Sequence, residues 1–331
     1  MKEEMTMPVS TISQPFDAAT CKRESTRLAF GKAVIDLGAQ KPDLVFLTAD
    51  GATPTGTVEF FKRYPDRAFN VGIAEQNLIG MAAGIASCGL PTVVGGYAPF
   101  LAYRSYEQVR NDIAYTKLNV TIGGVYSGIS MATGGSTHHT TEDLAAFRAM
   151  ANAIVITPAD AREAYKATFA AVEHGGCVYI RLGGRTPEPV LYTEDYDFRI
   201  GKAVTIREGE DATIIATGAV TTYAALAADE LKKDGFSVRV LNMHTVKPLD
   251  TEAVIKAARE TGQILTVEEH NVLGGLGGAV AEAVTNEYPV PVKRVGIQDI
   301  FASIGPLYGL HKKYGLTPEG IAASARDLLG K

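Results

Sequence analysis

The sequence has few of the features that mark disulfide-stabilised, secreted or membrane proteins. Its three cysteines, Cys21, Cys88 and Cys177, are far apart and form no CxxC pair, so neither a disulfide framework nor a thiolate zinc site is indicated. No run of about 18 apolar residues occurs, and the first residues, MKEEMTMPVSTISQPF, lack the apolar core of a signal peptide. The net charge of -5 gives no sign of nucleic-acid binding. We therefore expect a cytoplasmic globular protein that binds neither nucleic acid nor membranes.

Short β-rich runs alternate with helical patterns after about residue 20. Four runs are rich in β-branched residues and apolar on both faces, as in buried parallel strands; they cover residues 43–50, 120–126, 153–158 and 177–182. Between them, apolar residues recur at intervals of three or four. The helices predicted from this spacing cover residues 26–39, 74–89, 104–115, 141–150 and 160–175, with Thr141 and Asp160 as N-caps of the last two. Such alternation favours a doubly wound α/β domain with a mostly parallel sheet.

A change of composition separates this unit from a second one. Residues 183–203 contain prolines, glycines and charges without a sustained period, as in a linker. Alternation then resumes, with helices expected at 220–233, 251–261 and 276–287. The expected organisation is a first domain at residues 20–185, a linker at 186–200 and a smaller α/β C-terminal domain at 201–331.

One acidic residue is notable in FNVGIAEQNLIGMAAGIASCGLP, which begins at Phe69. Glu75 has apolar and small neighbours, follows a predicted strand and begins a predicted helix. Strand ends and helix starts line the ligand crevice of open α/β sheets, and a carboxylate is also stabilised by the positive end of the helix dipole. From its position alone, Glu75 is either an ordinary acid in a first helical turn or part of a ligand site.

Two further segments contain candidate site residues. In GGYAPFLAYRSYEQVR, the aromatic residues Tyr97, Phe100 and Tyr103 recur at every third position. Such a stripe usually faces a core, but the glycines and proline around its first part indicate a loop. In GGSTHHTTED, His138 and His139 lie among small residues. Adjacent histidines lack metal-ligand spacing and no third ligand is near, so we expect no metal site in this chain.

Together these segments resemble the pyrimidine-binding domain of transketolases, enzymes that depend on thiamine diphosphate. The resemblance runs from DRAFNVGIAEQNLIG through YEQVRNDIAYTKLNVTI and GSTHHTTEDLAAFRAM to LTVEEHNVLGGLGGAVAEAV, nearly the whole chain after residue 20. It is greatest to the separately encoded C-terminal half of split transketolases. It implies a transferase that moves a two-carbon ketol unit from a ketose, a sugar phosphate or a modified sugar, to an aldose.

The resemblance implies that several candidates bind the cofactor. Glu75 would hydrogen-bond the aminopyrimidine ring and so promote loss of the proton from the thiazolium carbon, a task that needs a carboxyl of raised pKa in an apolar pocket. Tyr97 and Phe100 would stack on the same ring. Tyr103 is a further candidate for this stacking.

Other candidates would contact the sugar. His138 would face the donor sugar and act with Glu75 in catalysis, because a histidine can exchange protons with a hydroxyl or carbonyl oxygen. His139 stands where the family usually has Gln. Arg27 and Arg181 occupy positions that contact the sugar phosphate, for which a bidentate guanidinium is suited; taken alone, each could equally be a surface ion-pair partner.

Three positions depart from the family pattern. Tyr126 replaces a histidine that helps bind the phosphate in many transketolases, and it is therefore also a candidate substrate-binding residue. Gly134 replaces an acidic residue associated with sugar hydroxyls, and Pro54 lies near a serine of the phosphate site. These departures raise the hypothesis of a modified sugar with another terminal group, such as a sulfonate or a branched-chain phosphate.

No GDG motif occurs in the chain, although thiamine-diphosphate enzymes use it, with a later Asn, to hold diphosphate and Mg²⁺. GGLGGAVAEAV at 274–284 is only a weak dinucleotide fingerprint. We therefore expect thiamine diphosphate and Mg²⁺ to be shared with an N-terminal transketolase subunit that contains the GDG motif, in an α2β2 assembly built on a dimer of this chain. The β subunit of a 2-oxo acid dehydrogenase is the alternative, and a non-catalytic binding protein on the same fold is a weaker one.

Overall fold

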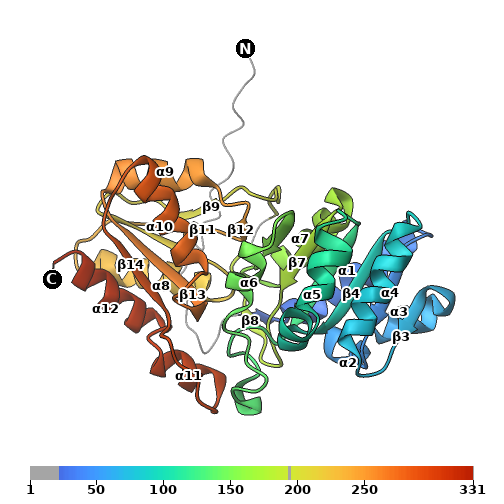
Figure 1. The fold of residues 1–331 in the computed structure, drawn as a ribbon. Helices are drawn as coiled ribbons and strands as arrows, with labels where there is room; N and C mark the ends of the chain where they lie inside the picture. Colours follow the sequence, from blue (N-terminus) through green and yellow to red (C-terminus); the bar gives the residue numbers. More distant parts are fainter. Residues whose placement is uncertain (1–21, 193–194, 331) are drawn as a thin grey trace.

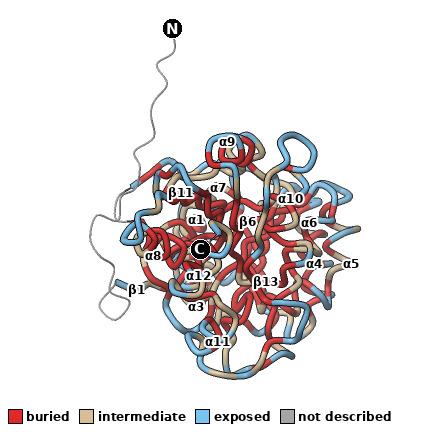
Figure 2. The backbone as a smooth tube through the Cα atoms, turned by 90° about the vertical axis from the view of Figure 1, so that its left-hand side faces the viewer, coloured by how far each residue is buried: buried red, intermediate tan, exposed pale blue. Residues whose placement is uncertain are grey.

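The structure is a computed structural model that describes residues 22–192 and 195–330 (Figure 1). It contains two sheets, each with helices on both faces, and the chain completes most of the first before it forms the second. The buried residues, red in Figure 2, lie along the strands and the inner helix faces. The expected doubly wound α/β architecture is confirmed. The outermost residues of the two expected domains, at 20–21 and 331, lie outside the described part.

The first sheet has seven strands in the order β12-β6-β7-β5-β4-β2-β3. Its strands are β2 (Val45–Thr48), β3 (Ala68–Asn70), β4 (Thr92–Tyr97), β5 (Val120–Val125), β6 (Ala153–Ile156), β7 (Cys177–Arg181) and β12 (Thr245–Lys247). All neighbours are parallel except β12 and β6. The four predicted strand runs are confirmed, because β-branched residues apolar on both sides suit a sheet covered on both faces.

Helices cover both faces of this sheet. One face is covered by α1 (Thr26–Gln40), α2 (Ala52–Thr55), α3 (Val58–Arg63) and α7 (Ala161–His174), and the other by α4 (Glu75–Ser87), α5 (Tyr106–Gln108) and α6 (Asp143–Ala149). Asp160 caps α7 by accepting a hydrogen bond from the Glu163 amide, as predicted. The predicted cap Thr141 is wrong, because α6 begins after Glu142 without a side-chain cap. The predicted helix at 104–115 is interrupted: π-helical turns, η2 (Phe100–Arg104) and η3 (Val109–Ala114), flank α5.

The second sheet has five strands in the order β14-β13-β10-β11-β9. They are β9 (Val204–Arg207), β10 (Ala212–Ala216), β11 (Val238–Asn242), β13 (Ile264–Asn271) and β14 (Val292–Ile297), of which β9 alone is antiparallel to its neighbour. Helices α8 (Val220–Lys233), α11 (Leu307–Lys313) and α12 (Pro318–Leu328) contribute to the core on one face, and α9 (Thr251–Thr261) and α10 (Leu276–Glu287) to the core on the other. The three helices predicted at about these positions are confirmed.

The second half of the chain contributes one strand to the first sheet. After β11 the chain returns to the first sheet and adds β12 to its edge. Between the units, β8 (Glu188–Pro189) pairs with β1 (Arg23–Glu24) in a short antiparallel ribbon. The carboxylate of Asp160 accepts hydrogen bonds of 2.9 Å from the amides of Leu191 and Tyr192. The connection is thus fixed to the first unit. In the part of the chain described, no helix is long and apolar enough to span a bilayer.

Candidate active site

The first sheet brings several predicted site residues to one edge. β7, β5, β4 and β2 are parallel neighbours, so their carboxyl ends lie side by side. Tyr97 ends β4, Tyr126 follows β5, and Arg181 ends β7. These residues are distant in the sequence and meet only because the strands are in register.

Glu75 begins α4 at this edge and is buried, with 4% of its surface exposed. Its Oε2 accepts a hydrogen bond of 2.7 Å from Nη1 of Arg104. The Arg104 guanidinium lies over the ring of Phe100, 4.4 Å from the ring centroid. The expectation of an apolar pocket around Glu75 is therefore wrong in one respect, because the turn η2 places the Arg104 guanidinium beside the Glu75 carboxylate at the start of α4.

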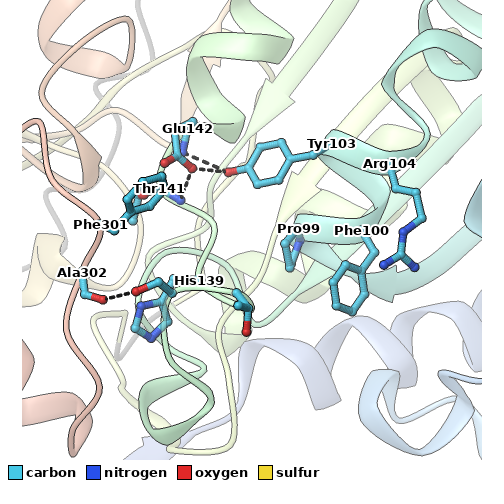
Figure 3. A pocket seen from close by; sticks show the side chains of 11 residues that line it. Pro99, Phe100, Tyr103, Arg104, His139, Thr141, Glu142, Phe301 and Ala302 are labelled. Atoms are coloured by element: carbon cyan, nitrogen blue, oxygen red, sulfur yellow. Dashed lines mark hydrogen bonds between the residues drawn. The ribbon is translucent and has the colours of Figure 1, made fainter.

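An open pocket of about 420 Å³ lies beside Arg104 and Phe100 (Figure 3). Tyr103, His139 and Glu142 line it from the first unit, and Phe301 and Ala302 line it from the second. Phe301 is 82% exposed, so the pocket has an apolar rim that the chain itself leaves uncovered. The site is thus formed by both units, which the sequence did not indicate.

Four of the predicted rings form a chain of contacts. Tyr97 stacks on Tyr126 with centroids 5.2 Å apart and lies 6.0 Å from the ring of Phe100. Phe100 meets His138 edge to face at 5.3 Å. Tyr103 is held apart, because its hydroxyl donates a hydrogen bond of 2.6 Å to Glu142 and accepts one from the Glu142 amide.

The two histidines have different surroundings. His138 is partly buried, and its Nδ1 lies 2.9 Å from the hydroxyl of Thr137. His139 is buried, with Nε2 near the carbonyl oxygen of Ala132 and Nδ1 without a hydrogen-bond partner. Burial lowers the pKa of His139, which favours the neutral ring. Within the described residues no cluster of three His, Cys, Asp or Glu side chains could hold a metal ion.

The predicted arginines do not form an open pair. Arg27 lies over Tyr126, 5.7 Å from its centroid, and donates to the carbonyl oxygens of Pro54 and Gly184. Arg181 is buried, and its guanidinium donates to Asp143 and to two backbone carbonyls. The geometry gives Arg181 a structural role that the sequence did not indicate; its contact with a sugar phosphate stays a prediction.

Arg185, which sequence reasoning missed, lies near enough to Tyr97 for its charge to affect that residue. Burial and the neighbouring Tyr126 raise the pKa of Tyr97, and the charges of Arg185 and Arg27 oppose this shift. Arg185 is exposed in the loop after β7, next to Gly184, which binds Arg27. Its place in the loop that follows β7, a strand that ends at the site edge, could have identified it from the sequence.

The departures from the family pattern have structural consequences. Tyr126 has a φ of +62°, an uncommon conformation for a residue other than glycine. A Cβ at Gly134 would lie 2.5 Å from Cγ of Met131 and 3.4 Å from Cβ of His138, so an acidic side chain would not fit without a shift. The carbonyl of Pro54 is occupied by Arg27. Changes at the three positions thus alter the surroundings of Arg27 and His138.

Comparisons with known proteins assign the chain to a family. Residues 22–185 match the transketolase pyrimidine-binding domain and residues 201–321 match the transketolase C-terminal domain. An apulose-4-phosphate transketolase subunit of Phocaeicola vulgatus is 39% identical over 92% of this chain and 97% of its own length. The 6-deoxy-6-sulfo-D-fructose transketolase subunit of a Clostridium species is 40% identical over 88% and 90% of the two lengths.

Solved structures agree. One described as a split gene transketolase, an inactive beta4 tetramer, is 41% identical, with a TM-score of 0.85 over 93% of this chain and 99% of that one. The transketolase of Campylobacter jejuni shares the fold at 19% identity, with a TM-score of 0.78 over 96% of this chain and 48% of that one. The chain therefore belongs to the transketolase family and corresponds to the C-terminal section of a split transketolase.

Proposed function

We propose that this chain is the subunit of a split transketolase that binds the pyrimidine end of thiamine diphosphate and the donor sugar. The observation that supports this most is the buried Glu75 carboxylate, which is bonded to Arg104, since Arg104 lies over the ring of Phe100 and both residues line an open pocket. A buried acid and an aromatic ring that share one planar neighbour suit a flat heterocycle with a basic nitrogen. The complete enzyme transfers a two-carbon ketol unit from a ketose to an aldose.

The residues present fit one end of the cofactor. Glu75 would bond the aminopyrimidine ring, Phe100 and Tyr97 would contact its faces, and His138 would face the sugar, since its ring adjoins Phe100. When bound, thiamine diphosphate supplies the stabilised carbanion on which ketol transfer depends. Diphosphate and Mg²⁺ would be held by a partner, because the sequence contains no GDG motif.

The proposed partner is an N-terminal transketolase subunit with the GDG motif, in an assembly of two copies of each chain built on a dimer of this one. A solved relative composed of one kind of chain is described as inactive, which supports a need for a second subunit. The relatives are named as transketolase subunits, and this does not favour the β subunit of a 2-oxo acid dehydrogenase.

The donor is proposed to be a ketose whose terminal group differs from that of a standard pentose phosphate. The relatives are named for apulose 4-phosphate and for 6-deoxy-6-sulfo-D-fructose. In this chain Tyr126 is stacked on Tyr97 beneath Arg27, so an aromatic ring occupies a place where the family has a histidine. Arg27 and the exposed Arg185 are two cations that could meet a phosphate or sulfonate at this edge.

Reconstitution tests the proposal. The purified chain would be mixed with a GDG-containing subunit, thiamine diphosphate and Mg²⁺, and ketol transfer measured from xylulose 5-phosphate, apulose 4-phosphate and 6-deoxy-6-sulfo-D-fructose. We expect no turnover from the chain alone and turnover of a modified ketose by the complex. Activity without a partner would contradict the split-subunit proposal, and ordinary transketolase rates with xylulose 5-phosphate would contradict the substrate proposal. Decarboxylation of 2-oxo acids instead would support the alternative.

A further inference from the structure

The segment that contains both candidate histidines, residues 127–142, is here called the histidine loop. Its ends are joined by two backbone hydrogen bonds between Gly128 and Thr140, of 3.1 and 2.8 Å. The loop has one short 3-10 turn, at Ala132–Gly134, and no longer helix or strand. The position of His138 therefore depends on what holds the loop from outside.

The second unit holds the histidine loop at three separate points. Oε1 of Glu269 accepts a hydrogen bond of 2.7 Å from the amide of Ile129, near the start of the loop. The hydroxyl of Ser136 donates to the carbonyl oxygen of Ala302 at 2.6 Å, near its middle. The amide of Asn271 donates to the carbonyl oxygen of Thr141 at 2.8 Å, near its end. Only the first of these contacts uses a side chain of the second unit.

Glu269 is itself fixed on its other side. Its Oε2 lies 2.7 Å from Nε2 of His311, and the two side chains are 12% and 5% exposed. Burial raises the pKa of Glu269, but the neighbouring His311 and Arg181 outweigh burial and hold this pKa below its usual value. Glu269 is thus ionised at neutral pH, and a bond to a charged acceptor is stronger than one between neutral groups.

Arg181 connects Glu269 to the far end of the loop. Its Nη2 donates to the carbonyl oxygen of Glu269 at 2.8 Å and to that of Thr140 at 2.9 Å. Its Nε donates to both oxygens of Asp143, the first residue of α6. Glu269 therefore contacts the start of the histidine loop directly and is linked to the end of the loop through the buried Arg181.

The fit around Glu269 is tight. A Cβ added to Gly128 would lie 2.2 Å from Oε1 of Glu269, and Gly128 has a φ of +61°. The carboxylate can approach the loop only because this position lacks a side chain. Such a close contact between the two units indicates a specific interaction, since a general apolar contact would tolerate an added methyl group more readily.

We propose that Glu269 is a positioning residue: by holding the histidine loop across the boundary between the two units, it sets the place of His138 in the active site. The catalytic consequence rests on the proposed function, whereas the hold on the loop does not. The C-terminal unit, which contributes no predicted catalytic residue, thereby takes part in the reaction through the position of the loop.

Hydrogen exchange in the full chain tests the hold itself. Glu269→Ala removes the acceptor of the Ile129 amide, and Glu269→Gln keeps an oxygen in its place. Glu268→Ala is the matched control, because Glu268 is also buried on β13, but its carboxylate accepts from the amides of Leu276 and Gly277 and lies 3.7 Å from Nδ1 of His270, all within the second unit. We expect exchange at Ile129 to quicken roughly tenfold or more in Glu269→Ala, and less in Glu269→Gln. Equal rates at Ile129 in Glu269→Ala and Glu268→Ala would overturn the proposal.

Kinetics of the reconstituted enzyme test the consequence. We expect Glu269→Ala to raise the donor KM and lower kcat, with partial recovery in Glu269→Gln, while deuterium exchange at the thiazolium carbon of thiamine diphosphate stays near the wild-type rate. A variant that had merely lost structure would lose both ketol transfer and deuterium exchange. Faster loop exchange with unchanged kcat and KM would overturn the catalytic part. If no ketol transfer occurs with any donor, the proposed function is contradicted. Hydrogen exchange at Ile129 still shows whether Glu269 holds the histidine loop.

Discussion

Arg104 donates a hydrogen bond of 2.7 Å to Glu75 while its guanidinium lies 4.4 Å from the centroid of the Phe100 ring. These are the two kinds of contact that we propose for the aminopyrimidine of the cofactor: a bond to the acid and packing on the aromatic ring. A planar cation thus lies where a flat ring is expected. The Arg104 side chain is 47% exposed on a π-helical turn, so an outward rotation would take it into solvent.

Removing Arg104 should therefore favour the cofactor. We predict that Arg104→Met in the reconstituted enzyme lowers the Kd for thiamine diphosphate severalfold, because the ring no longer competes with the guanidinium for Glu75. Titration calorimetry measures this. Arg110→Met is the control, since Arg110 is exposed nearby and its side chain bonds only its neighbour Asn111. A Kd that rises in Arg104→Met would mean that Arg104 binds the cofactor and does not compete with it.

Buried Glu188 should make stability depend on pH. Burial raises its pKa to about 7, above the usual value of 4.5, against the opposing hydrogen bonds from Thr26. In the folded chain Glu188 therefore keeps its proton between pH 4.5 and 7, whereas in the unfolded chain it does not. Its contribution to stability is present below pH 4.5 and is lost as the pH rises toward 7, by an amount on the order of 3 kcal/mol.

Urea unfolding of Glu188→Gln measures this. We predict that the unfolding free energy of the variant gains on that of the wild type as pH rises from about 4.5 to 7, because glutamine needs no proton. Glu24→Gln serves as the control: Glu24 pairs with Glu188 across the β1–β8 ribbon but is 41% exposed. A difference from the wild type that is constant over this pH range would contradict the assignment.

Gly128 should be far less replaceable than another glycine of the same conformation. Gly128 and Gly176 have φ values of +61° and +76°, so alanine costs each roughly 1–2 kcal/mol of backbone strain. A Cβ meets the Glu269 carboxylate at Gly128, and nothing within 4 Å at Gly176. We predict that Gly128→Ala lowers the unfolding free energy by about 2 kcal/mol more than Gly176→Ala. Equal losses of unfolding free energy in the two variants would show that Glu269 does not lie close against the loop at Gly128.

Tyr126 should influence the choice of donor. Histidine tolerates a positive φ better than most residues, so Tyr126→His should fold. We predict that it raises kcat/KM for xylulose 5-phosphate relative to modified ketoses, since it restores the residue that many transketolases have there. Tyr126→Phe keeps the stack on Tyr97 and should leave this ratio unchanged. An unchanged ratio in Tyr126→His would remove Tyr126 from the specificity-determining residues.

The sequence predicts local elements far better than long-range partners. Helices such as Val220–Lys233 follow from apolar spacing, and buried strands from runs of β-branched residues. The return of Thr245–Lys247 to the first sheet has no local signal, because strand pairing is decided by tertiary structure. The same holds for the site. Glu75 and Phe100 could be named from motifs. The pairing of Glu75 with Arg104 could not, because it depends on a π-helical turn that the spacing of apolar residues does not indicate.

Contacts between the two units are even harder to predict from the sequence. The family resemblance predicts that Arg181 is an anion contact, yet its guanidinium donates to Asp143 and to the carbonyl of Glu269. Glu269 lies 140 positions after Ile129, and nothing in its surroundings along the chain indicates that contact. These groups meet only because the two units contact each other in the folded chain.

The most direct test of the account is deuterium exchange at the thiazolium carbon of thiamine diphosphate in the reconstituted enzyme, which needs no knowledge of the sugar. We predict that Glu75→Gln slows this exchange by at least about 100-fold, while assembly with the partner subunit and thermal stability change little. Glu142→Gln, at an acid that lines the pocket, should leave the rate within a few-fold of wild type. An exchange rate in Glu75→Gln close to that of the wild type would contradict the claim that this chain activates the cofactor through Glu75.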